Sequence, residues 1–121
     1  AREMGVNYIL AKELQSSSFS DIRYKVDSFV LDKENIYITI CADVFSSAFA
    51  PGVSATQSLG LDPEIVMPII RHIVRTGKVR GFDVCEVSPR FDQDDTTANL
   101  AAVLIFSVVN TLCESKGRLI D

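Results

Sequence analysis

Four side chains that could bind a metal ion or handle a proton stand near the ends of two apolar runs. Cys41 and Asp43 follow one β-branched run, and Asp83 and Glu86 lie towards the end of a second. Residues two apart on an extended chain point to the same face, so we expect Cys41 and Asp43 to lie side by side. Hard divalent cations prefer carboxylate oxygens, and these strand-borne acids could supply part of such a site.

A purely structural interpretation of the same residues stays open. Asp43 would then cap the loop that follows it, Cys41 would be a small buried hydrophobe, and Glu86 would pair with an arginine. Residue types alone do not separate this interpretation from a metal site, because structural ion pairs use the same side chains.

The elements that must position these residues alternate between strand and helix. We expect strands at 6–10, 36–40 and 79–87, and helices at 21–30, 63–76 and 97–113. Asp62 and Pro63 are typical of a helix start, and Gly77 of its end. Repeated strand–helix pairs without a hairpin signal predict an α/β fold with a parallel sheet, which binds ligands at the carboxyl ends of its strands.

Burial can also be predicted from the pattern of apolar residues. The strand 36–40 is apolar almost throughout, as expected for a strand covered on both faces. The helix 97–113 is apolar around most of its circumference, which predicts that it is largely buried, with Asp95 or Thr96 as its cap. The long loop 43–61 contains Phe45 and other apolar residues, so we expect it to be packed.

Other candidate sites have simpler explanations. His72 is the only histidine and lies mid-helix between Arg71 and Arg75 in the sequence, which favours a packed or surface role over a metal role. The acidic turn 92–95 lacks the glycine and distal glutamate of a calcium loop, so capping explains it better. No glycine-rich phosphate loop follows a strand, which disfavours nucleotides.

Composition restricts the classes of partner. The chain has 121 residues and a net charge of −4, which argues against nucleic acid or an anionic membrane as partner. No apolar run approaches the roughly 18 residues that span a bilayer. The three cysteines are too few and too far apart for a disulfide framework, so we expect a reducing cytoplasm.

Three ordered motifs resemble those of the ureohydrolases, the family of arginase, agmatinase and formimidoylglutamase. They are ITICADVFSSAFAPG at 38–52, GFDVCEVSP at 81–89 and DQDDTTANLAA at 92–102. The first is similar to the family's second metal-binding motif, and the second to its strand that ends in a substrate-facing glutamate. The sequence APGVSA at 50–55 is most similar to the formimidoylglutamases.

The resemblance implies a three-layer arginase-like fold, of which this chain would be a partial domain of about three βα units. The expected reaction is hydrolysis of N-formimino-L-glutamate, a small molecule, to L-glutamate and formamide in histidine degradation, with two Mn²⁺ ions activating the attacking water. Asp43 and Cys41 would be metal ligands, and Glu86 would face the cationic formimino group. Arginase or agmatinase activity remains an alternative.

Two departures from the family pattern limit what this chain can do alone. Position 41 is cysteine where the family usually has a bridging aspartate, and a thiolate suits Zn²⁺ better than Mn²⁺. The family's first-half ligands are absent, so we expect this segment alone to be inactive. Residues 1–121 would be the C-terminal part of one ureohydrolase domain, completed by the N-terminal half of the same protein within a homo-oligomer.

Two further alternatives belong to other classes. One is a non-catalytic relative whose metal site decayed at Cys41. The other is a free-standing α/β binding module with no metal. The opening residues 1–5 are typical of a last helical turn closed by a glycine, which favours a chain that starts inside a larger protein.

Overall fold

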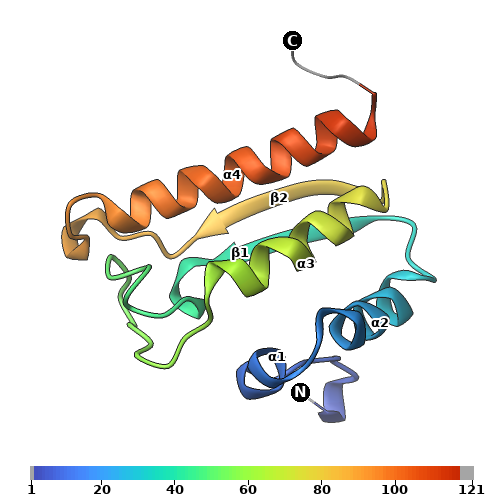
Figure 1. The fold of residues 1–121 in the computed structure, drawn as a ribbon, viewed down its shortest axis with the longest axis horizontal. Coiled ribbons are helices and arrows are strands. Elements are labelled where there is room, and N and C mark those ends of the chain that lie inside the picture. Colours follow the sequence, from blue (N-terminus) through green and yellow to red (C-terminus); the bar gives the residue numbers. More distant parts are fainter. Residues whose placement is uncertain (1, 118–121) are drawn as a thin grey trace.

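The computed structural model describes residues 2–117, in which the predicted alternation of strands and helices is largely present (Figure 1). The helices are α1 (Ala11–Ser16), α2 (Phe19–Val30), α3 (Pro63–Arg75) and α4 (Thr96–Ser115), the strands are β1 (Ile36–Cys41) and β2 (Val79–Cys85), and single 3₁₀ turns lie at Arg2–Met4, Ala42–Val44 and Pro89–Phe91. Gly5 has a left-handed φ of 67° and ends the first turn, as predicted, while Ala1 lies outside the described residues.

The two strands pair in parallel, which confirms the predicted direction of the sheet. Their register places Ile40 opposite Val84 and Cys41 opposite Cys85, so both strands end at the same edge. α3 forms the crossover between them, as a parallel connection requires. Each strand retains one unpaired edge, because the described sheet has only these two strands.

The strand predicted at 6–10 is wrong for this structure. Residues 6–10 have no regular secondary structure, and the side chains of Val6, Tyr8 and Leu10 are about half exposed. The sequence has strand-forming composition, but a strand needs a neighbouring strand to pair with, and the sheet described in residues 2–117 consists of β1 and β2. α1 was not predicted at all, and α2 begins at Phe19, before the expected start at Asp21.

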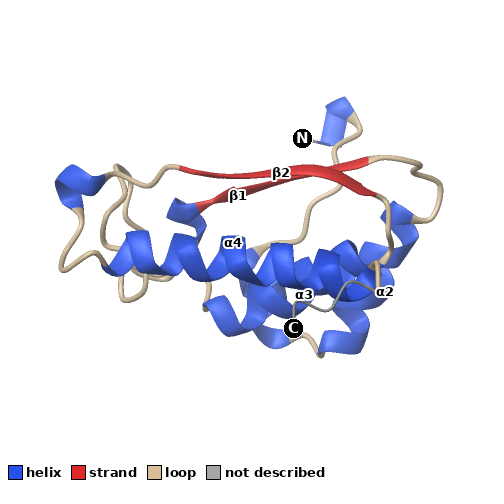
Figure 2. Cartoon of the chain, turned by 90° about the horizontal axis from the view of Figure 1, so that it is seen from above, coloured by secondary structure: helices blue, strands red, loops and turns tan. Residues whose placement is uncertain are grey.

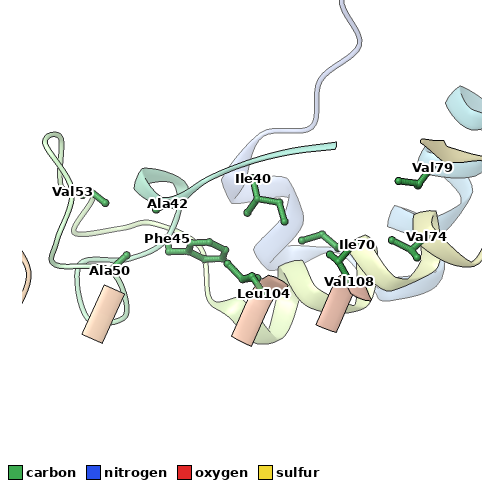
Figure 3. Packing of buried hydrophobic residues seen from close by; sticks show 10 residues of the cluster. All are labelled: Ile40, Ala42, Phe45, Ala50, Val53, Ile70, Val74, Val79, Leu104 and Val108. Carbon is green, nitrogen blue, oxygen red and sulfur yellow. The ribbon is translucent and has the colours of Figure 1, made fainter. Parts of the chain in front are cut away.

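The helices α2, α3 and α4 all lie on one side of the two strands (Figure 2). Ile40 from β1 contacts a cluster that includes Ile70 of α3 and Leu104 of α4, together with buried residues of the loop after β1 (Figure 3). The alternate residues Tyr37 and Thr39 face the other side and are exposed. The expectation that β1 is covered on both faces is therefore wrong for the described residues: one sheet face is packed and the other is open.

α4 is also less buried than its composition predicts. Leu104 and Val108 pack into the core, whereas Phe106 is 71% exposed and Val103 is 50% exposed. By length and composition alone this helix could cross a membrane, contrary to the sequence expectation, although 28% of its apolar window is buried within the protein. Its buried stripe packs against α3 and β2, as in the helix layer of an α/β domain.

Candidate functional site

The carboxyl end of β1 brings together the two residues that alternation predicts. The Cys41 thiol donates a hydrogen bond to Asp43 Oδ1 at 2.7 Å, and both side chains are half-buried. Asp43 lies on the 3₁₀ turn Ala42–Val44 that directly continues the strand, so the backbone fixes the pair. Burial and the hydrogen bond to the Asp43 carboxylate raise the pKa of the Cys41 thiol to about 12. Cys41 is therefore a neutral thiol in this arrangement.

Glu86 lies directly after β2, at the same edge of the sheet as Cys41. Its backbone has a φ of 63°, a left-handed conformation that costs a non-glycine residue free energy. The Ser54 hydroxyl donates to Glu86 Oε2 at 3.5 Å, which links the loop after β1 to the end of β2. The Glu86 side chain is exposed, so its carboxylate is accessible to a cationic ligand.

Asp83 lies two residue pairs back from the strand ends, opposite Thr39 on the open face of the sheet. Its Oδ1 atom is buried and has no hydrogen-bond partner among the described residues. The carboxylate instead interacts with the Tyr37 hydroxyl, and this hydrogen bond raises the pKa of Tyr37. Buried carboxylate oxygens normally accept a hydrogen bond, so we expect a further hydrogen-bond donor to approach Asp83 Oδ1 on the open face.

The predicted residues do not gather into one metal site. Among residues 2–117, no group of three or more histidine, cysteine, aspartate or glutamate side chains is arranged to hold a metal. Cys41 and Asp43 form a two-donor pair, and Glu86 hydrogen-bonds to Ser54. His72 lies away from the sheet edge, with Nε2 2.5 Å from Asp27 Oδ1 of α2, which agrees with the helix-surface role predicted for it.

A junction that sequence reasoning missed anchors the loop after β1. The Gly52 N–H donates to the buried hydroxyl of Thr97 at 2.7 Å, and the Ser88 N–H donates to the Gly52 carbonyl at 2.7 Å. A Cβ atom on Gly52 would lie 2.5 Å from that of Asp92, so only glycine fits. The junction thus joins the loop, the segment after β2 and the start of α4.

The cap of α4 belongs to the same junction. Asp92, and not the predicted Asp95 or Thr96, accepts hydrogen bonds from the N–H groups of Thr97 and Ala98, each at 3.0 Å. Burial tends to raise the pKa of Asp92, but these and neighbouring hydrogen bonds lower it overall. Asp95 occupies the cap position with a left-handed φ of 56° and makes no side-chain cap. The acidic turn is a helix cap, as predicted, through a different residue.

Comparison with known sequences gives a consistent set of relatives. A sequence model of the arginase family matches residues 1–110. A formimidoylglutamase from Clostridium tetani (strain Massachusetts / E88) is 54% identical over 117 residues, which cover 97% of this chain and 35% of that protein. This chain therefore spans about a third of the length of such relatives.

Solved structures agree on the fold. A proclavaminate amidino hydrolase from Streptomyces clavuligerus superposes with a TM-score of 0.84 at 28% identity, over 94% of this chain and 38% of that chain. A formimidoylglutamase from Bacillus subtilis subsp. subtilis str. 168 superposes with the same TM-score, 0.84, at 22% identity, over 92% of this chain and 35% of that one. The predicted partial arginase-like α/β domain is confirmed by these superpositions.

Proposed function

Because this chain belongs to the arginase family, we propose that it forms part of a formimidoylglutamase that hydrolyses N-formimino-L-glutamate to L-glutamate and formamide. The observation that carries the proposal is the 54% identity to the Clostridium tetani formimidoylglutamase, which extends over 97% of this chain. The motif at 50–55 lies within this match and belongs to the loop that contacts Glu86 through Ser54.

The donor pair at the end of β1 suits one part of a divalent-metal site. Asp43 offers a carboxylate to a hard cation such as Mn²⁺, while Cys41 offers a softer donor that favours Zn²⁺. Two donors are fewer than such sites use, so the remaining ligands would come from the part of the protein outside this chain. When bound, the metal would supply a water acidified enough to act as a nucleophile near neutral pH.

Glu86 is the residue we assign to the substrate. Its carboxylate is exposed at the sheet edge, and the left-handed backbone turns the chain immediately after β2. A carboxylate there would pair with the cationic formimino group through charge-assisted hydrogen bonds. The Ser54 hydroxyl would hold Glu86 in orientation and keep the loop against the bound substrate.

The rest of the protein would complete this domain. The open sheet face, the unpaired strand edges and the lone Asp83 Oδ1 atom are features that further strands and helices satisfy in α/β domains. We assign this covering to the two-thirds of the parent protein that precede or surround this chain. The exposed apolar face of α4, with Phe106 and Val103, would serve contacts between subunits of a homo-oligomer.

The test is hydrolysis by the complete protein of three separate substrates: N-formimino-L-glutamate, L-arginine and agmatine. We expect release of L-glutamate and formamide from the first, with little urea from the other two. Urea from arginine or agmatine as the main product would instead identify an arginase-type or agmatinase-type enzyme.

One observation favours a second candidate, a non-catalytic relative. Cys41 donates a hydrogen bond to Asp43 at 2.7 Å, so the two candidate ligands are paired with each other in this arrangement. A decayed centre would hold fewer metal ions per complete chain than the two expected of an active enzyme of this type. Metal analysis of the complete protein separates the two candidates, and it does not depend on choosing the right substrate.

A further inference from the structure

The last residue pair of the sheet consists of two cysteines. Cys41 of β1 and Cys85 of β2 are opposite one another in the register, and both are half-buried free thiols. Side chains of directly paired residues emerge on the same face, here the open one that also carries Thr39 and Asp83. Paired strands lie about 4.8 Å apart, within the Cα separation of about 4.4–6.8 Å that disulfides span.

The two thiols also contact each other. A hydrogen bond with Cys85 is one of the interactions that the Cys41 thiol makes, alongside its 2.7 Å bond to Asp43. The third cysteine, Cys113, lies in the last turn of α4. That end of the helix is far from the carboxyl ends of the strands (Figure 1). The sheet edge therefore carries one adjacent pair of thiols, and Cys113 is a separate thiol.

We propose that Cys41 and Cys85 are a site of reversible oxidation, at which a hydroperoxide converts the two thiols into a cross-strand disulfide. Hydrogen peroxide first oxidises the Cys85 thiol to a sulfenic acid, and one water leaves. The Cys41 sulfur then attacks the Cys85 sulfur, forming the S–S bond as the S–O bond breaks. In total two thiols lose two electrons and two protons, and the peroxide is reduced to two waters.

The surroundings of the pair assign the order of these steps. The Cys41 sulfur lies beside Asp43 Oδ1, which places it to act as the attacking sulfur, so we assign the first oxidation to Cys85. Asp43 Oδ1 lies 2.7 Å from the Cys41 sulfur and is placed to accept the proton as that sulfur attacks. The proton then passes to the departing hydroxide, which leaves as water. Cys41 therefore acts as the resolving thiol.

Oxidation would change the candidate site directly. The disulfide removes the Cys41 S–H group that Asp43 accepts from, and it ties the end of β1 to the end of β2. Formation of the bond does not depend on catalysis. Only its consequence for turnover rests on the proposed function, because Cys41 would then be unable to ligate a metal.

The experiment treats the complete protein with hydrogen peroxide, removes the peroxide, unfolds the protein in denaturant with N-ethylmaleimide to block remaining thiols, and maps the cysteine peptides by mass spectrometry. We expect loss of alkylation at Cys41 and Cys85 together, with a linked peptide pair that dithiothreitol separates. Cys113→Ser is the matched control and should form the same link. Cys85→Ser should leave Cys41 alkylated at the same peroxide concentration.

Alkylation of both Cys41 and Cys85 after treatment, or irreversible oxidation of Cys85 without a linked peptide, would overturn the proposal. Turnover is measured on the same samples before and after dithiothreitol. A linked peptide in a protein that hydrolyses none of the three substrates supports the oxidation site and contradicts the proposed function, so the two failures are distinguishable.

Discussion

Replacement of Thr97 by valine tests whether the junction at Gly52 holds the loop of the candidate site. Thr97 is fully buried, and its hydroxyl accepts from the Gly52 N–H at 2.7 Å while also bonding to the Asp92 side chain. Valine has nearly the same shape but no hydroxyl. The substitution therefore removes hydrogen bonds without opening a cavity.

The expected loss of stability follows from the hydrogen-bonding group that Thr97→Val leaves without a partner. The Gly52 N–H is buried and would lose its partner, and an unsatisfied buried donor costs about 1–3 kcal/mol of stability. Thr97→Ser is the control, since it keeps the hydroxyl and removes one methyl group, at about 1 kcal/mol. We expect Thr97→Val to be the less stable variant.

The assay is urea unfolding of the complete protein, followed by turnover at a urea concentration where all variants remain folded. Because the loop carries Ser54, which bonds to Glu86, Thr97→Val should also lower turnover more than Thr97→Ser. Equal free energies of unfolding for Thr97→Val and the wild type would refute the role assigned to this junction. Lower stability with unchanged turnover would show that the junction does not position Glu86.

Three further predictions concern the core, the helix surface and position 41. Phe45→Ala should lower the free energy of unfolding by about 3–5 kcal/mol in urea titrations, because Phe45 is fully buried within the loop after β1. Hydrogen bonding to His72 lowers the pKa of Asp27, so this contact stabilises the fold above about pH 4 and its contribution is lost as the pH falls. In urea titrations at pH 7, Asp27→Asn should therefore unfold at a lower urea concentration than the wild type. This difference should shrink below about pH 4. Cys41→Asp should raise the Mn²⁺ content of the complete protein in metal analysis, since it replaces a neutral thiol with a hard oxygen donor.

Features set by a few neighbouring residues were predictable from sequence. Asp62 caps α3 by accepting from the Glu64 N–H at 2.7 Å, as its position before a helical pattern indicated, and Ser18 caps α2 in the same way by accepting from the Asp21 N–H. The two-residue period of an extended chain predicted that Cys41 and Asp43 would lie side by side, and they do, although Asp43 lies on the 3₁₀ turn Ala42–Val44. In each case the donor and acceptor lie within three residues of one another.

Features that depend on distant segments were not predictable in the same way. The segment 6–10 has the composition of a strand but has no regular secondary structure, and the face of α4 around Phe106 has the composition of a buried helix but Phe106 is 71% exposed. The composition of a segment shows whether it could form a buried strand or helix. The segment becomes buried only where another segment packs against it. The Clostridium tetani relative is about three times longer than this chain.

The links that build the site are long-range and irregular. Ser54 reaches Glu86 across 32 residues, and Gly52 reaches Thr97 across 45. Asp92 caps α4 from outside the usual position because left-handed residues at Asp94 and Asp95 fold the turn back towards it. The motif from 92 to 102 contains both residues of this cap, Asp92 and Thr97, five residues apart. The folded turn is needed to show that this spacing brings the Asp92 carboxylate to the start of α4.

The most direct test of the metal site at the end of β1 compares Asp43→Ala with the wild type in the complete protein. Metal content and hydrolysis of N-formimino-L-glutamate are measured together, with Asp32→Ala, an exposed acid on the turn after α2, as control. Loss of a ligand should reduce bound metal and lower turnover by more than the roughly 10–100-fold that changes around metal ligands cause. We expect this loss for Asp43→Ala alone; normal metal content with normal turnover in that variant would show that Asp43 is not a metal ligand.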